Sequence, residues 1–369
     1  MLLRFNKTGL YISIIGILMF FLSMETVHAE SGESENHQEQ SKEKSVDAGN
    51  IILGHVQDFH EWHIATIGET HITIPLPIIL YDKDQSKLIA FMSSKFHHGH
   101  ESYKGFKLTD KSNIVPVKPG TMEVDNTRQK PIDFSITKTV AGIFITVILM
   151  LLVFMTVAKR YKQNPDRAPK GLQSLMEPLI LFVQNDIGKN SIGEHKYERF
   201  MPFLFTMFFF IFFANLIGLI PFFPGGANIT GNISVTLTLA LFSFFATNLS
   251  GNKYYWKHVF NTPGVPWWLK FPLPLMPIVE LLGLITKPFV LMVRLFANIL
   301  AGHIIILGFI SLIFIFGVTN AIAGYGVSLF SVAFSVFINF LELLVAFIQA
   351  YVFTLLTALY LGDAVQESH

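Results

Sequence analysis

Charged side chains and a histidine stand in the most apolar part of this sequence. Between Phe271 and Gly362 the Asp, Glu, Lys, Arg and His residues are Glu280, Lys287, Arg294, His303 and Glu342. An arginine at the centre of a membrane helix costs roughly 3 kcal/mol on insertion scales, so charges retained there mark ion or proton pathways. An imidazole titrates near neutral pH, so a histidine opposite a carboxylate suits proton transfer. These residue types predict proton movement within a membrane.

The spacing of these residues places them on different faces of a helix. A step of seven residues returns to within about 20° of the same direction on an α-helix. Glu280, Lys287 and Arg294 are seven residues apart, so they share one face, and Asn298 lies near it. His303 is nine residues beyond Arg294, which puts it on roughly the opposite face and about 13 Å further along.

A second polar set lies on the last apolar segment. Glu342 and Gln349 are seven residues apart and nearly coincide on one face, with Asn339 close to them. Polar groups on different faces and at different depths favour two aqueous paths over one pore. Purely structural roles stay open for four of these residues. Glu280 and Lys287 could snorkel at a helix end or form an ion pair, and Asn298 and Gln349 could form hydrogen bonds between helices.

The composition is that of a membrane protein. Of the 369 residues, 51% are hydrophobic and 14% are charged, against about 25% charged residues in soluble proteins. The absence of cysteine excludes disulfides, thiolate metal ligands and cysteine nucleophiles. The sequence has no P-loop, GxGxxG, HExxH or nucleophile elbow, so we expect no nucleotide chemistry, no cofactor and no catalysis by this chain alone.

The N-terminus has the three parts of an export signal. Arg4 and Lys7 form a basic region, Leu10–Leu22 an apolar region, and Val27–Ala29 a cleavage site. We expect residues 1–29 to be a cleaved signal peptide, and an uncleaved anchor helix is the alternative. Residues 30–49 are polar and of low complexity, which is typical of a disordered linker.

Residues 50–135 predict a small β-rich domain on the exported side of the membrane. Alternating runs at 71–74 and 87–91 indicate strands, and turn signals at 81–84 and 119–120 separate them. The domain is rich in histidine: His55, His60, His63, His71, His97, His98 and His100. Imidazole suits zinc and copper, but this spacing matches no established metal template, so no metal site is predicted.

Residues 136–369 predict an all-α polytopic membrane domain with about five membrane helices. The expected spans are Val140–Ala158, Met201–Phe223, Val235–Leu249, Pro277–Phe316 and Val327–Leu361. The last two flank a Gly-rich turn at 317–326, and each would be roughly 50–60 Å long. Because the hydrocarbon core is only ~30 Å thick, these two helices must tilt strongly, bend or lie partly in the membrane plane.

Basic residues set the orientation of these segments. The basic run at 159–162 follows the first span, which makes that side cytoplasmic by the positive-inside rule. The spacing over 172–183 predicts an amphipathic helix on the cytoplasmic face, and the Lys and Trp residues of 253–270 indicate a cytoplasmic interfacial loop. We expect a multi-pass protein of the cell inner membrane with a periplasmic N-terminal domain and a cytoplasmic C-terminus.

Several of these segments match a known family in order. Residues 294–303, RLFANILAGH, resemble the RLF-x-N-x-x-AG segment of subunit a of F-type ATP synthases. Residues 337–361, with IQAYVF at 348–353, resemble that family's last helix. NLIGLIP at 215–221 and GNISVT at 231–236 look like its second segment and the loop after it. The resemblance covers residues from about 140 to 363.

The resemblance implies a stator that conducts protons. Subunit a stands beside a rotating ring of c subunits, whose carboxylates are loaded and unloaded through two offset half-channels. Arg294 matches the family's essential arginine, which faces the ring and separates the half-channels. A guanidinium cannot lose its proton in a protein, so it favours the ionised ring carboxylate and blocks direct passage of protons.

The other polar residues take their implied roles from the same resemblance. His303 and Glu342 fall where the family carries a His/Glu pair along one proton path. Three further residues match polar positions near the arginine or on the access route: Asn298, Gln349 and Glu280. The family's acidic residue in the second segment is here Gly218. The exported domain of about a hundred residues also departs from many family members, which begin nearly at the first span.

The sequence thus predicts the proton-conducting stator subunit of an F-type ATP synthase, coupling proton-motive force to rotation and ATP synthesis. Expected partners are the c-ring, the b subunit and lipid, with no nucleic acid and no small-molecule substrate other than protons. The alternative is a secondary transporter with an Arg/His/Glu relay, which predicts inverted repeats and a central substrate site; neither is visible. A simple proton channel would have no use for an arginine barrier.

Overall fold

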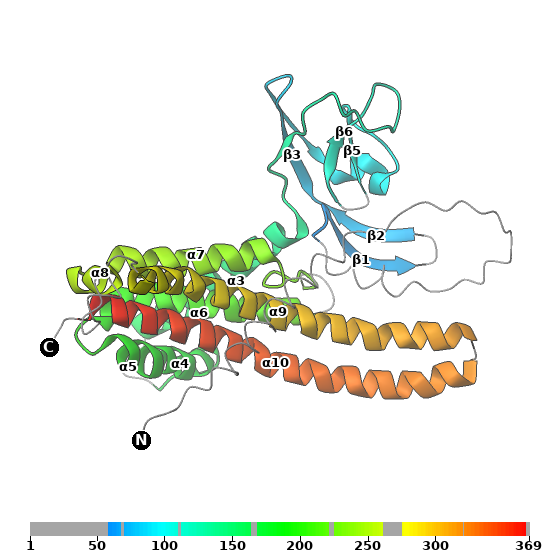
Figure 1. Cartoon of the computed structure of the whole chain (residues 1–369). Helices are drawn as coiled ribbons and strands as arrows, with labels where there is room; N and C mark the ends of the chain where they lie inside the picture. Colours follow the sequence, from blue (N-terminus) through cyan, green and yellow to red (C-terminus); the bar gives the residue numbers. More distant parts are fainter. Residues whose placement is uncertain are drawn as a thin grey trace, which may run out of the picture. The chain divides into compact units, whose positions relative to one another are not determined.

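The computed structural model describes residues 58–67, 70–109, 112–163, 168–220, 225–260, 275–319 and 321–366. The expected signal peptide and linker, residues 1–49, lie outside this part of the chain. Strands and one 3-10 helix occupy the described residues up to 133, and helices follow from residue 138 (Figure 1). This order confirms the predicted fold class, an all-α membrane region preceded by a β-containing region.

The β-containing region has seven short strands among its described residues. They are β1 (Glu61–Ile67), β2 (Thr70–Pro75), β3 (Pro77–Asp82), β4 (Lys87–Met92), β5 (Phe106–Leu108), β6 (Ile114–Pro116) and β7 (Ile132–Asp133). β1 pairs with β2, β3 lies between β4 and β7, and β5 pairs with β6, all antiparallel. The predicted runs at 71–74 and 87–91 fall in β2 and β4.

A small core holds these strands together. Alternate side chains of β3 point to one face, where Ile78 and Leu80 are fully buried. They pack with Phe96, from the 3-10 helix Ser93–Gly99, and with Phe106 of β5. The period of two along β3 is the pattern expected of a strand with one buried face.

The start of β1 is tied to the first membrane helix, α3 (Lys138–Gln163). The Lys138 N–H donates to the carbonyl of Phe59 at 2.8 Å, and the Thr139 N–H donates to Asp58 Oδ1 at 3.0 Å. The first amides of an α-helix have no partner within the helix, and a carboxylate there is favoured by the helix dipole. The β-containing region therefore completes the N-terminus of α3.

Five helices in the described residues are long and apolar enough to cross a membrane, as predicted. They are α3, α6 (Tyr197–Leu219), α7 (Ile233–Ser250), α9 (Leu275–Thr319) and α10 (Ala321–Val365). Four shorter elements lie between them: α4 (Leu172–Phe182), a π-helical stretch (Val183–Lys189), α5 (Asn190–Ile192) and α8 (Lys253–Phe260). α4 is the helix predicted over 172–183.

The interfacial loop predicted at 253–270 begins as a helix instead. α8 covers Lys253–Phe260, and the remainder, 261–274, lies outside the described residues. Asn252 Oδ1 accepts a hydrogen bond from the Tyr255 N–H, which caps the first turn. Trp256 stacks on Phe260 one turn later, at the spacing that brings helical side chains together.

The Gly-rich turn predicted at 317–326 is also mostly helical. α9 continues to Thr319, and α10 begins at Ala321. A Cβ on Gly324 would lie only 2.7 Å from the Cα of Gly317. These glycines therefore allow two helices to approach closely, as small residues do between membrane helices.

α9 and α10 run side by side, and each is 45 residues long (Figure 1). At 1.5 Å per residue each would measure about 68 Å, more than twice the ~30 Å hydrocarbon core. The structure confirms the two long segments; that they tilt strongly, bend or lie partly in the membrane plane stays a prediction. Pro288 lies inside α9 without ending it.

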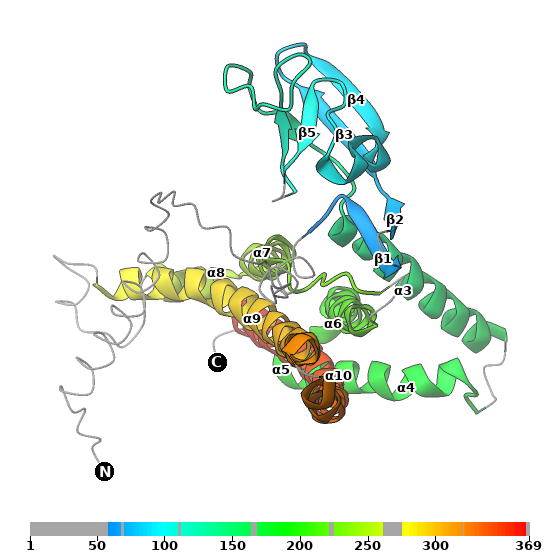
Figure 2. The same ribbon diagram turned by 90° about the vertical axis from the view of Figure 1, so that its right-hand side faces the viewer.

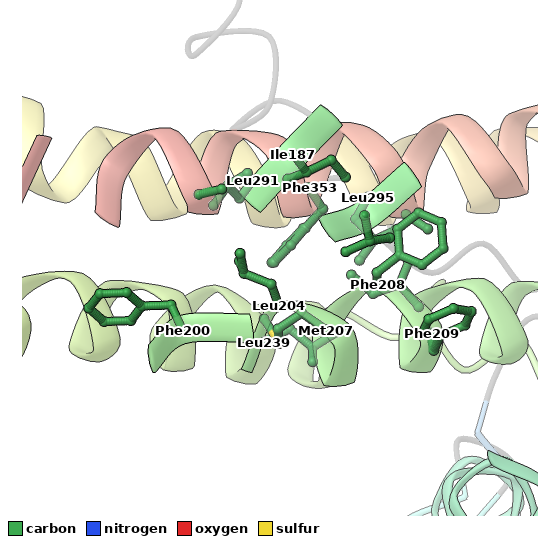
Figure 3. Packing of buried hydrophobic residues seen from close by; sticks show 14 of the residues in the cluster. Ile187, Phe200, Leu204, Met207, Phe208, Phe209, Leu239, Leu291, Leu295 and Phe353 are labelled. Atoms are coloured by element: carbon green, nitrogen blue, oxygen red, sulfur yellow. The ribbon is translucent and has the colours of Figure 1, made fainter. Parts of the chain in front are cut away.

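α6 is the central helix of the membrane region. Figure 2 shows it end-on between α3 on one side and α9 and α10 on the other. Phe208 and Phe209 of α6 are fully buried, and they belong to one apolar cluster with Leu291 of α9 and Phe353 of α10 (Figure 3). This cluster fixes which faces of α9 and α10 turn inward.

Hydrogen bonds join several helix ends on the side away from the β-containing region. The Asn252 N–H, between α7 and α8, donates to the carbonyl of Ala364 near the end of α10. Lys196 Nζ, just before α6, donates to the carbonyl of Val365. The end of α7, the start of α6 and the C-terminal end of α10 therefore lie on one side.

We predict that Phe106→Ala destabilises the β-containing region by about 3–5 kcal/mol, because it leaves a cavity in the core. Hydrogen exchange of the detergent-solubilised chain would show faster exchange in β3 and β4. Leu88→Ala, at a side chain that is 62% exposed, should leave exchange unchanged. Equal exchange in both variants would contradict this account of the core.

His60 is hydrogen-bonded to Asp133, a carboxyl group that responds to acid. His60 Nε2 lies 3.1 Å from Asp133 Oδ2. Burial raises the pKa of Asp133, but hydrogen bonds from His60 and from the side chain and amide of Ser135 outweigh it, so this pKa lies below its ordinary value of 3.8. A lowered carboxyl pKa stabilises the fold above the ordinary value, and this stabilisation is lost as the pH falls through the folded-state value.

We therefore expect Asp133→Asn to lower the protection of β3 and β7 amides from hydrogen exchange at pH 7. The difference from the wild type should shrink as the pH falls below about 3.8. Exchange measured from pH 7 to pH 3 on the solubilised chain checks this. A difference that grew on acidification would rule out the stabilising carboxylate.

Candidate functional site

Arg294 lies on an outward face of α9. Its neighbours Leu291 and Leu295 are buried in the apolar cluster and hold α9 in place, whereas Arg294 itself is exposed. It forms no ion pair with any acidic residue in the part of the chain that the structure describes. A guanidinium in an apolar setting needs a negative partner, and none comes from these residues.

Glu280 and Lys287 do not form the ion pair that was the structural alternative. Both side chains are half-buried on α9, and no salt bridge joins them. Lys287 Nζ lies 4.8 Å from the ring centroid of Tyr360 on α10. This cation–π contact fastens the first half of α9 to the end of α10. The shared face predicted for Glu280, Lys287 and Arg294 thus borders α10 at Lys287 and is open at Arg294.

Asn298 and Gln349 lie in different environments. Asn298 is exposed on α9 near Arg294, and Gln349 is buried on α10. Neither side chain makes a hydrogen bond with a described residue. The structure therefore does not use this pair of amides as a link between the helices.

His303 and Glu342 are brought together, as predicted. His303 Nδ1 lies 3.6 Å from Glu342 Oε1, and the Glu342 side chain is 9% exposed. Oε1 is buried and has no hydrogen-bond partner in the described residues. A buried carboxylate is costly unless it is paired, so this oxygen depends on the imidazole beside it.

The polar atoms that the described residues place around the His303 ring are acceptors. Nδ1 lies 3.1 Å from the carbonyl oxygen of Ile299, and Nε2 lies 3.4 Å from that of Gly218 on α6. A neutral imidazole has one N–H and would leave one nitrogen lone pair against a carbonyl, whereas an imidazolium donates from both nitrogens. The site can therefore hold a proton on the ring. The carbonyl of Gly218 fills the place where the resemblance leads one to expect an acidic residue.

A glycine makes room for this pair. A Cβ on Gly302, one residue before His303, would collide with Oε1, Cδ and Cγ of Glu342. A side chain at this position would force the Glu342 carboxylate to move from its place beside the backbone of α9. The small-residue step before the histidine is thus a steric requirement of the His303–Glu342 pair.

Arg294 and His303 lie on opposite flanks of one buried stripe. The stripe is made by Leu291, Leu295 and Ile299, all buried in the apolar cluster. Nine residues turn an α-helix through about 180° beyond two full turns. The separation predicted from spacing is therefore also seen in burial: Arg294 is exposed, and His303 faces α6 and α10.

The sequence comparisons identify the membrane region. The model of the family described as ATP synthase A chain matches residues 140–362, which is more than half of the chain. The chain belongs to the ATP synthase subunit a family. A second model, described as a domain of unknown function (DUF8433), matches residues 51–134.

Curated relatives support this family assignment. ATP synthase subunit a of Chloroherpeton thalassium is 46% identical over 245 residues, covering 64% of this chain and 69% of the relative. ATP synthase subunit a 2 of Prosthecochloris aestuarii is 45% identical over 245 residues, covering 64% of this chain and 71% of the relative. The predicted membership of the family of subunit a is therefore confirmed.

Within the membrane region, the structure adds buried polar residues that sequence reasoning missed. Asn215 of α6 donates from Nδ2 to the carbonyl of Ala346 on α10 at 3.3 Å. Thr230 Oγ1 donates to Asn215 Oδ1 at 2.5 Å. Asn228 Nδ2 is buried without a partner in the described residues. The available signal was an Asn at 215 inside a Phe- and Ile-rich helix, a residue that is costly there unless it is bonded.

The described histidine side chains of the β-containing region do not form a cluster. His60 pairs with Asp133, and His97 lies 3.6 Å from Glu101. The described residues contain no group of three or more His, Asp or Glu side chains arranged to hold a metal. His55 lies outside the described residues.

We predict that Gly302→Ala impairs the His303–Glu342 pair, because the added methyl group displaces the carboxylate. Overpacking of this kind costs about 1–3 kcal/mol, and proton-driven ATP synthesis by the reconstituted complex should fall several-fold. Gly308→Ala is the matched control on the same helix, since a Cβ there meets nothing within 4 Å. Equal rates for the two variants would mean that the position of Glu342 does not matter.

Proposed function

We propose that the two flanks of α9 serve two offset proton half-channels, with Arg294 between them and a partner's carboxylate facing it. As a member of the subunit a family, this chain is the proton-conducting stator subunit of an F-type ATP synthase. The observation that carries the proposal is the contrast between an exposed, unpaired Arg294 and a buried His303–Glu342 pair on the opposite flank.

Arg294 acts as a fixed charge. Its proton is not exchangeable in a protein, so it cannot pass protons along, and it stabilises an ionised carboxylate opposite it. The partner that supplies this carboxylate is the ring of c subunits, because the described residues leave Arg294 open and unpaired. Rotation brings each carboxylate to this charge, where it gives up its proton.

The His303–Glu342 pair carries protons along one half-channel. The acceptors around the ring allow it to hold two protons, and the neighbouring carboxylate can take one of them. Asn298 and Gln349 lie between this pair and Arg294 along α9 and α10 and offer hydrogen bonds to water. Glu280, two seven-residue steps before Arg294, serves the other half-channel.

The orientation follows from charge and from the β-containing region. Basic residues follow α3 at 159–162, and the helix ends joined near Ala364 and Val365 lie on the side away from the strands. The positive-inside rule makes that side cytoplasmic. We propose a periplasmic N-terminal domain, a cytoplasmic C-terminus and a place in the cell inner membrane, with the b subunit as a second stator partner.

A secondary transporter fits the structure less well. Such a protein places its substrate site inside the bundle, between broken helices. Here α9 and α10 are continuous over 45 residues each, and the arginine points out of the bundle. A channel that works alone would also leave the arginine unpaired.

Arg294→Ala in the reconstituted ATP synthase tests the proposal. Removing one partner of a buried ion pair costs about 3–5 kcal/mol, so we expect proton-driven ATP synthesis to fall roughly a hundredfold or more. Lys287→Ala is the matched control, because it removes a positive charge seven residues earlier on the same face. It should retain most of the activity. Normal synthesis by Arg294→Ala would disprove the mechanism.

A further inference from the structure

Trp62 of β1 is fastened to the loop that follows α6. Its indole Nε1–H donates to the carbonyl of Gly225 at 3.1 Å, and the bond is buried. The ring is 3% exposed and packs with Ala214 of α6 and with Ala227 and Ile229 of the loop. A buried indole N–H requires an acceptor. The acceptor here, the Gly225 carbonyl, belongs to the membrane region and lies 163 positions after Trp62 in the sequence.

The same loop is held from a second side by α3. A Cβ on Gly142 would lie 3.0 Å from the Cβ of Ala227 and 3.1 Å from two side-chain atoms of Ile229. Residues 225–232, which we call the outer loop, are therefore clamped between β1 and α3. A displacement of Trp62 would remove the contacts that hold the outer loop on the β1 side.

The outer loop carries polar groups inward. Thr230 is 1% exposed, and its hydroxyl donates to Asn215 Oδ1. Asn215 in turn donates to the carbonyl of Ala346 on α10. The loop is thus hydrogen-bonded to α6 directly and to α10 through one amide.

Those contacts lie one helical turn from the His303–Glu342 pair. Asn215 is three residues before Gly218, whose carbonyl faces His303 Nε2, and Ala346 is four residues after Glu342. Residues three and four apart are neighbours on a helix surface. Three hydrogen-bonded contacts, the loop residues between Gly225 and Thr230 and one helical turn therefore connect the Trp62 indole to the proton-carrying pair.

We propose that the exported domain forms the outer wall of the proton path to the His303–Glu342 pair, with Trp62 as the positioning residue that holds the outer loop. This inference rests on the proposed function. The family model of the membrane region begins at residue 140, and the model of the exported region ends at 134, so the wall comes from a part of the chain outside the membrane family. The charged groups recorded at the pair are His303 and Glu342 themselves.

The test uses the complete ATP synthase in vesicles, with ATP synthesis measured against the pH on the exported side. Trp62→Phe keeps a ring and loses the N–H, so Gly225 loses its donor. We expect the proton concentration on the exported side that gives half-maximal synthesis to rise about fivefold, the factor that corresponds to one lost hydrogen bond. The maximal rate per assembled complex should stay unchanged. Trp62→Ala should shift the profile further.

Thr230→Val provides an independent arm, because it removes the hydroxyl that reaches Asn215. It should shift the profile in the same direction, and the double variant with Trp62→Phe should shift it by less than the sum, since both act on one loop. Phe134→Ala is the control in the same domain, at a ring that is 61% exposed. It should leave the profile in place.

Hydrogen exchange of the outer loop keeps the proposal falsifiable. If Trp62→Phe and Trp62→Ala speed exchange at Ile229 and Asn232 but leave the pH profile unchanged, Trp62 is only structural and the proposal is wrong. Additive shifts in the double variant would also overturn it. If either result is obtained and the Arg294→Ala variant is inactive, the proposed function stands and only the inference about Trp62 fails. If the Arg294→Ala variant is active, the proposed function itself is wrong, whatever the Trp62 variants show.

Discussion

The unpaired charge of Arg294 is the constraint on which the arrangement of the membrane region depends. A guanidinium cannot be neutralised by losing its proton, and in lipid it is stable only beside a negative group or water. The described residues supply no acidic partner, so α9 must present this residue outward at a fixed height. Leu291 and Leu295, on the adjoining face, supply the apolar packing that holds it there.

The same packing that turns Arg294 outward turns the His303–Glu342 pair inward. A buried carboxylate is tolerable only when a donor lies within reach, and the imidazole lies 3.6 Å away. The missing Cβ of Gly302 allows this approach, and the carbonyl of Gly218 orients the other ring nitrogen. One helix thus separates the permanently charged Arg294 from the His303–Glu342 pair by a buried apolar stripe.

The β-containing region is bonded to the membrane region as well as preceding it in the sequence. Asp58 caps the first turn of α3, and the indole of Trp62 bonds to the loop after α6. Both contacts are polar bonds between segments far apart in the sequence, which fix the relative position of their partners more specifically than apolar contacts do. The domain at residues 51–134 is thereby bonded both to the start of α3 and to the loop after α6.

The sequence alone determined the membrane class, the five spans, strands β2 and β4 of the β-containing region and the opposite flanks of Arg294 and His303, because hydropathy and helical period are local properties. It did not determine that α8 is helical, that the glycines at 317 and 324 serve close packing, or that Asn215 and Thr230 are bonded. Those features depend on which surfaces meet: a cap from Asn252, the approach of two helices, and a loop clamped by Trp62 and Gly142. The Trp62–Gly225 bond joins residues 163 positions apart, which no local pattern records. The Asn252 cap and the approach of Gly324 to Gly317 join residues close in sequence, and the sequence did not reveal them because Asn and Gly also favour turns.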